Sequence, residues 1–233
     1  MAYMHRALLL ISAILLSSAA GPMGAQAPAD MTVYAVAYVD AIASGRGAMA
    51  SALKPYRDTS RKESGSLRVD VLEQTGRPGH FVVIEAWRDQ AALDAHATSA
   101  PVKQLHGALD PVRASGYDQR PYEPLSVAPA GATAGGRAVY VVTHVDIAGA
   151  AAQTEAPGML RRLAEASRKE AGCIRFEVLQ HAMRRNHYTV FEIWQSQAAL
   201  DAHAAAVPTR QYRDTVQPMS GSPVDERLYT AID

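Results

Sequence analysis

Two groups of side chains with the same types and spacing are the residues of this sequence best suited to chemistry. They are Glu85, Trp87 and His96 in the first group, and Glu192, Trp194 and His203 in the second. Histidine exchanges a proton near neutral pH, a carboxylate accepts or holds one, and an indole offers a flat wall for an aromatic ring. This combination predicts acid–base chemistry on a small aromatic compound.

The glutamate and tryptophan of each group are expected on a β-strand, over residues 80–87 and 187–194. Alternate side chains of a strand share a face, so Phe81 and Tyr188 fall beside them. We expect the glutamates and histidines to be catalytic, and Phe81, Trp87, Tyr188 and Trp194 to bind substrate. The pattern is also typical of a core tryptophan beside a structural glutamate and of a helix histidine packed on a tryptophan.

The two groups lie in two copies of one domain. Residues 60–97 return without a gap as residues 167–204, with 21 of 38 positions identical at an interval of 107 residues. This interval is too long for a solenoid repeat and suits one small domain. We therefore expect a leader over residues 1–29, a first domain over 30–125, a linker of small residues over 126–136 and a second domain over 137–233.

Each copy alternates in the order strand, helix, strand, strand, helix, strand. In the first copy the strands are expected over residues 33–40, 67–73, 80–87 and about 117–122, with helices over 47–63 and from about 90. In the second copy they are expected over 139–146, 174–180, 187–194 and 224–232, with helices over 156–170 and from about 197. Pro55 is expected to bend or divide the first helix.

This order predicts an α+β fold of two ferredoxin-like βαββαβ domains, each with an antiparallel sheet covered on one face by two helices. The other face of each sheet needs a partner. The linker is flexible enough for the two sheets to pack together, which predicts an intramolecular pseudo-dimer. Further oligomerisation stays open.

The composition and the N-terminus indicate an exported protein without a polyanionic partner. Hydrophobic residues make up 48% and charged residues 20%, and 23 basic side chains balance 23 acidic ones, so no net charge favours nucleic acid. His5 and Arg6 precede an apolar run over residues 7–16, which is typical of a secretory signal and too short for a permanent membrane span. We expect cleavage after Ala27 or Ala29, a periplasmic or secreted location and no stable membrane insertion.

Several other features narrow the chemistry. Cys173 is the single cysteine, so no internal disulfide forms, and its place at the start of an apolar strand predicts a small buried filler. No HExxH, glycine-rich phosphate loop, CxxC or GxSxG motif occurs, and no metal site is predicted. The repeated Ser-Arg-Lys-Glu at residues 60–63 and 167–170 is a secondary candidate for holding a substrate anion. His80 and His187 begin strands and are expected to be solvated.

The pattern Ser-x-x-Glu-x-Gly, an apolar strand, Glu-x-Trp and Ala-Leu-x-x-His resembles the antibiotic biosynthesis monooxygenase domain in both copies. This resemblance implies a dimeric α/β barrel within a single chain. The family includes cofactor-independent quinol and anthrone oxygenases, heme-degrading enzymes and an isomerase of a signalling sugar phosphate, so the fold does not determine the chemistry. Heme-degrading members place an axial histidine where this chain has His106 and Arg213, and a first-strand asparagine that both copies lack. We therefore expect no cofactor, heme included.

Together these observations predict an exported, cofactor-independent monooxygenase-like protein that oxidises a small aromatic or quinol compound with dioxygen. A histidine would ionise the phenol or quinol, and an apolar pocket would let the resulting carbanion or phenolate meet dioxygen. The alternatives are a noncatalytic periplasmic protein that binds a small ligand, and an isomerase that uses the same histidine. Whether one or both copies are active stays open.

Overall fold

The computed structural model describes residues 31–128, 134 and 137–232. The predicted leader over residues 1–29, with both candidate cleavage positions, and most of the predicted linker over 126–136 lie outside these residues. The described part of the chain consists of two repeats with the same succession of elements.

The first repeat follows the predicted order, except that its second helical segment is two helices. Its elements are β1 (Val33–Asp40), α1 (Arg46–Ser60), β2 (Ser66–Gln74), β3 (His80–Trp87), α2 (Gln90–Ala97), α3 (Ala100–Leu109) and β4 (Asp118–Ser126). The break between α2 and α3 has a local cause, because Pro101 occupies the first turn of α3 and disfavours a helical residue before it.

The second repeat has the same plan with one additional 3₁₀ turn. Its elements are β5 (Val139–Asp146), α4 (Ala150–Ser167), β6 (Cys173–His181), β7 (His187–Trp194), α5 (Gln197–Ala205), α6 (Val207–Val216), η1 (Gln217–Met219) and β8 (Asp225–Ala231). Pro208 divides α5 from α6 as Pro101 divides α2 from α3.

Two helices with an internal proline are continuous in the structure. Pro55 lies inside α1 without dividing it, because Leu53 and Tyr56 on either side of it are anchored in the core. The helix expected from residue 156 begins at Ala150, so Pro157 lies within α4 and not in its first turn.

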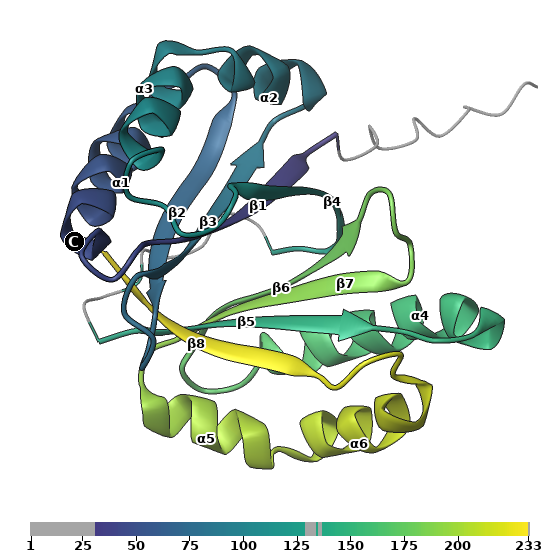
Figure 1. Ribbon diagram of the computed structural model, residues 1–233. Helices are drawn as coiled ribbons and strands as arrows, with labels where there is room; N and C mark the ends of the chain where they lie inside the picture. Colours follow the sequence, from purple (N-terminus) through teal and green to yellow (C-terminus); the bar gives the residue numbers. More distant parts are fainter. Residues whose placement is uncertain (1–30, 129–133, 135–136, 233) are drawn as a thin grey trace, which may run out of the picture.

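The strands close into one antiparallel barrel in the order β1-β3-β2-β8-β5-β7-β6-β4 (Figure 1). The last strand of each repeat joins the two repeats, because β4 pairs with both β1 and β6, and β8 pairs with both β5 and β2. Helices α1 to α3 cover one side of the barrel and α4 to α6 the other (Figure 1). The predicted α+β fold, an intramolecular dimeric α/β barrel, is confirmed.

The repeats also exchange the ends of these strands. Ile232, just after β8, belongs to the hydrophobic core under the helices of the first repeat, and its carbonyl accepts a hydrogen bond from Arg57 of α1. Leu125 of β4 packs against the corresponding core of the second repeat, and its carbonyl accepts one from Arg161 of α4. Each helix layer is therefore completed by the other repeat.

Each barrel strand has one face in the barrel and one face under the helices. On β3, Val82 and Ile84 belong to the barrel core, whereas Phe81 and Val83 belong to the core beneath α1 and α3. Side chains alternate between the two faces, so Glu85 lies beneath the helices with Phe81 and Val83. The candidate site of each repeat is therefore outside the barrel, between sheet and helices.

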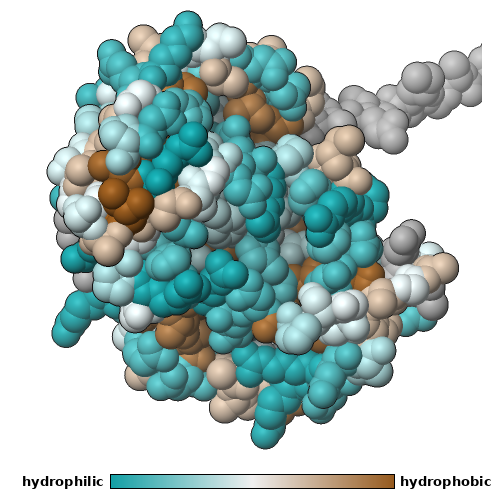
Figure 2. Space-filling model, in the orientation of Figure 1, coloured by the Kyte–Doolittle hydropathy of each residue, from teal (hydrophilic) through white to brown (hydrophobic). Residues whose placement is uncertain are grey.

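The visible surface is mostly hydrophilic, with small and separate hydrophobic areas (Figure 2). The large hydrophobic side chains exposed in the described part of the chain are Met31, Ile42, Leu67, Met183, Val207 and Val224. Val224 lines a cavity in the second repeat.

Candidate functional site

A close approach of helix to turn positions the histidine in each repeat. Gly65 has φ +84°, and a Cβ there would lie 2.5 Å from the Cβ of Ala92 on α2. Gly172 has φ +83°, and its Cβ would lie 2.6 Å from that of Ala199 on α5. Only glycine allows both this backbone conformation and this contact. The contact holds the histidine of each helix against the glutamate two residues before the glycine.

In the second repeat, His203 is held on two sides. Its Nδ1 lies 3.0 Å from Oε2 of Glu170, and its ring stacks on Trp194 with centroids 4.6 Å apart and an interplanar angle of 27°. The indole Nε1 of Trp194 donates to Oε2 of Glu192 at 2.7 Å, and that oxygen lies 3.8 Å from Nε2 of His203. Since a carboxylate only accepts, Glu170 fixes the proton on Nδ1 and leaves the lone pair of Nε2 toward Glu192.

The environment changes the pKa of both His203 and Glu192. Burial raises the pKa of Glu192 to about 7, against a smaller lowering by the hydrogen bond from Trp194. Burial also lowers the pKa of His203, and the nearby Glu170 offsets this only in part. A neutral histidine therefore stands beside a carboxyl group that gains and loses its proton near pH 7. Such a pair is suited to proton transfer.

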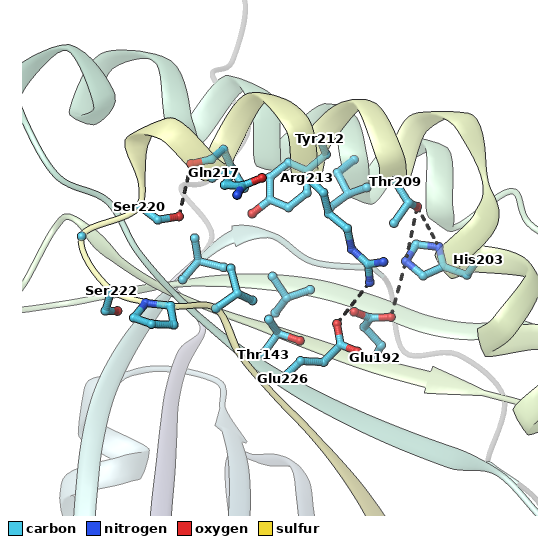
Figure 3. Close-up of a pocket in the computed structure, with 17 residues that line it drawn as sticks. Thr143, Glu192, His203, Thr209, Tyr212, Arg213, Gln217, Ser220, Ser222 and Glu226 are labelled. Carbon is cyan, nitrogen blue, oxygen red and sulfur yellow. Dashed lines mark hydrogen bonds and ion pairs between the residues drawn. The ribbon is translucent and has the colours of Figure 1, made fainter.

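A cavity of about 660 Å³ opens beside this pair (Figure 3). Leu163 of α4, Val190 and Glu192 of β7, and His203 of α5 form part of its wall. The rest comes from α6, the segment after it, β5 and β8, and includes Thr143, Thr209, Tyr212, Val216, Gln217, Ser220, Val224 and Glu226. Its wall is mainly hydrophobic with a few polar groups, which is typical of a small-molecule site.

Two polar contacts lie on the α6 side of the cavity. The hydroxyl of Thr209 lies 3.3 Å from Nδ1 and 3.5 Å from Nε2 of His203. Arg213 pairs with Glu226 at 3.3 Å, and both side chains are about half exposed. Figure 3 shows this ion pair between α6 and β8, beside the histidine and Glu192.

The first repeat has the corresponding glutamate, tryptophan and histidine, and in addition a tyrosine side chain that lies against the glutamate and the histidine. The hydroxyl of Tyr56 on α1 donates to Oε1 of Glu85 and lies 2.9 Å from Nε2 of His96. Nδ1 of His96 lies 3.0 Å from Oε2 of Glu63, and Trp87 stacks on the histidine with centroids 4.4 Å apart. Both ring nitrogens of His96 are therefore engaged within the protein.

These contacts give His96 the opposite electrostatic character from His203. Burial by itself lowers the pKa of His96, but the hydrogen bonds and charges of Glu85 and Glu63 outweigh it, so the pKa is raised. When the ring is protonated, it donates to Glu63 and to the oxygen of Tyr56, whose own proton goes to Glu85. A ring in this state has no lone pair with which to accept a proton.

Two substitutions between the repeats account for the difference in space. Tyr56 of the first repeat corresponds to Leu163 of the second, and Tyr117 corresponds to Val224. Tyr56 is buried, and both aliphatic counterparts line the cavity. Burial, followed by the charge of Glu85, raises the pKa of Tyr117, so both tyrosines stay neutral beside that carboxyl group. The two predicted sites are therefore not equivalent.

The structure places the predicted substrate-binding aromatic residues away from the cavity wall. Trp194 is fully buried behind His203, and Tyr188 is buried in the core, with its hydroxyl accepting from Gln180. Trp87 and Phe81 are equally buried in the first repeat. The tryptophans fix the histidine and the glutamate, while contact with a ligand falls to other side chains.

The other histidines singled out in the sequence lie away from both pairs. His80 lies 2.6 Å from Asp40, and His187 lies 3.4 Å from Asp146, at one end of the barrel, where both are partly exposed. His106 is exposed on α3 and contacts the ring of Tyr117 edge-on. Within the described residues, no three His, Cys, Asp or Glu side chains are grouped so as to hold a metal ion.

Sequence reasoning gave two residues of these sites another role and did not single out several others. Glu63 and Glu170 were candidates for holding an anion, whereas they bind the histidines. Tyr56 in the first repeat, and Thr209 and Glu226 in the second, were not singled out. The signal for the glutamates was their identity in both copies at a fixed distance from the histidine. Tyr56 stands where the second copy has Leu163, but the two helices differ at most positions, so no clear signal for it lies in the sequence.

Cys173 is half-buried at the start of β6, where it packs against the core of the second repeat. Burial, followed by the charges of Glu192 and Glu170, raises the pKa of its thiol to about 11. Only about one thiol in 1,000 is then ionised at pH 8. We expect iodoacetamide to label the native protein on the order of 100-fold more slowly than the urea-unfolded protein, as measured by mass spectrometry. Equal rates would show that the thiolate is not suppressed.

Along the part of the chain that the structure describes, no helix combines the length and the apolar character needed to cross a membrane. Comparison with curated proteins gives no significant match. The sequence does match the family model described as antibiotic biosynthesis monooxygenase, over residues 32–108 and again over 138–215.

Solved structures share the whole barrel. A Fusobacterium nucleatum protein described as "putative monooxygenase" has a TM-score of 0.81 at 13% identity, covering 88% of this chain and 94% of its own. A Lactobacillus acidophilus protein with the same description has a TM-score of 0.74 at 14% identity, covering 87% and 95%. An anthrone oxidase-like protein has a TM-score of 0.67 at 12% identity, covering 88% and 93%. At these identities the similarity is one of fold.

The family match falls on both repeats and spans more than half of the chain. Each matched segment contains the Glu-x-Trp pair, the histidine and the first three strands of its repeat, whereas β4 and β8 lie outside the matched segments. The protein therefore belongs to the antibiotic biosynthesis monooxygenase family, with two copies of the domain in one chain.

Proposed function

We propose that this protein is a cofactor-independent monooxygenase that oxidises a small phenolic or quinol compound in the cavity of the second repeat. The observation that carries the proposal is the neutral His203 beside Glu192 at the wall of a cavity of about 660 Å³. The family match and the barrel shared with an anthrone oxidase-like protein support it.

His203 is the proposed base. Its Nε2 carries the free lone pair and faces the cavity beside Glu192, while Glu170 holds the other ring nitrogen. Removal of a proton from a phenol or quinol gives an electron-rich anion that reduces dioxygen directly. Oxidation of a phenol to its para-quinone by one O₂ puts one oxygen atom on the ring carbon, removes the hydrogens of that C–H and of the O–H, and releases them with the second oxygen atom as one water. All electrons come from the substrate, so no cofactor is needed.

Glu192 is the proposed acid. Because its pKa is raised to about 7, a large fraction of its carboxyl groups is protonated at neutral pH. It can therefore return a proton to the reduced oxygen when the O–O bond breaks, and it then recovers one from His203. The apolar part of the wall, with Leu163, Val190 and Val216, would lie against the ring of the substrate anion while dioxygen reacts with it.

The experiment that tests this proposal is oxygen uptake by the mature, metal-free protein with quinols, hydroxyanthrones and catechols. We expect His203→Ala to lower the rate at least about 100-fold, which is typical for loss of a general base. The matched control is His96→Ala, which removes the corresponding histidine of the occupied site and is expected to leave the rate of folded protein within a few-fold. Equal losses in both variants, or full activity of His203→Ala, would contradict the assignment.

A proton-transfer reaction without oxygen is the second candidate. The distance of 3.8 Å between Nε2 of His203 and Oε2 of Glu192 favours it, because an acid and a base that close can move a proton between two carbons of one substrate. Turnover of a panel compound under nitrogen would identify this isomerase activity. Saturable binding with no turnover in either atmosphere would indicate a noncatalytic ligand-binding protein.

Export is part of the proposal. The apolar run over residues 7–16 and the small residues up to Ala29 support a cleaved leader. Expression with a periplasmic fraction and intact-mass measurement would distinguish cleavage after Ala27 from cleavage after Ala29. Full-length protein confined to the cytoplasm would contradict export.

A further inference from the structure

We infer that the first repeat contains a latent second binding site, in which the side chain of Tyr56 takes the place of a phenolic ligand on Glu85 and His96. This inference rests on the proposed function in one respect only, the phenolic class of the ligand. The same site is present in both repeats, and the side chain of Tyr56 fills it in the first.

The hydrogen bonds of Tyr56 are those of a bound phenol. Its oxygen donates to the carboxylate of Glu85 and lies 2.9 Å from Nε2 of His96, so one hydroxyl joins both groups. In the second repeat, Oε2 of Glu192 lies 3.8 Å from Nε2 of His203, close to the 3.5 Å between Glu85 and His96. The hydroxyl of Thr209 lies 3.3 Å and 3.5 Å from the two nitrogens of His203, but the position that the Tyr56 hydroxyl takes in the first repeat has no tyrosine in the second, because Leu163 stands there.

The space follows the same pattern. Leu163 and Val224 replace Tyr56 and Tyr117, and both line the cavity beside Glu192 and His203. The side chain of Tyr56 is nearly inaccessible to solvent, with 5% exposure. The room that the first repeat uses for a phenol ring of its own is thus part of an empty cavity in the second.

The tryptophan and the glutamate that hold the histidine are arranged in the same way in both repeats. The histidine stacks on the tryptophan at interplanar angles of 28° and 27°, and its Nδ1 lies 3.0 Å from the glutamate of the preceding turn in each. A site that had lost its use and kept only packing would not need this ion pair twice. Removal of Tyr56 is therefore expected to free the ligand position on Glu85 and His96, while Tyr117 still narrows the site.

The test uses 4-methylphenol, which is the side chain of tyrosine, in calorimetric titrations of the mature chain. We expect one site in the native protein, two in Tyr56→Ala and one in Tyr56→Phe, whose ring still fills the space. Toluene, which has no hydroxyl group, should bind the opened site about tenfold more weakly, the value of one hydrogen bond. Adding Leu163→Tyr to Tyr56→Ala should close the second-repeat cavity and return the count to one.

The outcomes separate this inference from the proposed function. One site in both the native protein and folded Tyr56→Ala overturns the latent site and leaves the second-repeat cavity in place. No site in the native protein and one in Tyr56→Ala supports the latent site and overturns the second-repeat assignment. If Tyr56→Ala does not fold, Tyr56→Leu replaces it, and saturating 4-methylphenol should restore folding by binding the folded state. Absence of any restoration overturns the inference.

Discussion

Glu192→Gln is expected to stabilise the protein by about 3 kcal/mol at pH 8 and to leave its stability almost unchanged at pH 4. The carboxyl group has an ordinary pKa of 4.5 and a pKa of about 7 in the folded protein, with burial as the main cause. The unfolded chain therefore loses this proton at lower pH than the folded chain. The free energy of unfolding falls as pH rises from about 4.5 to about 7 and is level above that range. Glutamine does not titrate, so the variant does not lose this free energy of unfolding as pH rises.

Urea unfolding of the native protein and Glu192→Gln across this pH range measures the effect. The amide oxygen of glutamine can still accept from Trp194, so the geometry of the site is retained. The matched control is Glu85→Gln in the first repeat. The Glu85 side chain accepts hydrogen bonds from Tyr56 and Trp87 and lies 3.5 Å from Nε2 of His96, so an amide would lose favourable contacts there. The control should give no gain at pH 8. A gain for Glu192→Gln that is the same at pH 4 and pH 8 would rule out titration of this group as its cause.

The same substitution is expected to lower oxygen uptake at least about 100-fold, because an amide cannot return a proton to reduced oxygen. Higher stability with lower activity is the expected signature of a functional group that is held in an unfavourable environment. Unchanged uptake would assign Glu192 a structural role and leave His203 as the only acid–base group of the pair.

Glu177→Ala is expected to destabilise the protein by roughly 3–5 kcal/mol, the usual cost of removing one partner of a buried ion pair. Glu177 of β6 is only 1% exposed and lies 2.8 Å from Arg68 of β2 and 2.6 Å from Arg175. Arg68 also lies over the ring of Phe191, at 4.9 Å from its centroid. These contacts join the two repeats, so alanine leaves two arginines without their shared carboxylate.

The control is Glu123→Ala, since Glu123 of β4 also pairs across the two repeats, with Arg185 at 2.5 Å, but both side chains are more than half exposed. Solvent screens that pair, so the expected loss is about 1 kcal/mol or less. Urea unfolding at one pH compares the two variants. Equal losses would show that burial of the Glu177 pair does not determine its contribution.

Much of the fold was predictable because the duplication and the alternation of apolar residues are local properties of the sequence. The eight strands were found near their predicted positions, and Glu85 and Trp87 were correctly placed on one face of β3. The division of α2 from α3 could have been read from Pro101. The exchange of β4 and β8 between the repeats could not, because a strand pairs equally well with a neighbour from either copy.

The candidate sites were less predictable because their partners are distant in sequence. The ion pair of Glu63 with His96 joins residues 33 positions apart, and Tyr56 reaches Glu85 across 29 positions. Neither contact follows from spacing along a helix or a strand. Each depends on how α1 and α2 pack on the sheet.

The sequence by itself determined that the chain has two copies of one domain, that each copy carries a glutamate, a tryptophan and a histidine, and that each forms the same succession of strands and helices. Only the tertiary structure decided that these groups lie under the helices and that the second repeat alone leaves its histidine free to accept a proton. The physical reason is that residue type sets which groups can titrate, whereas burial and hydrogen-bond partners set their pKa, and the ring of Tyr56 supplies such a partner in one repeat and not in the other.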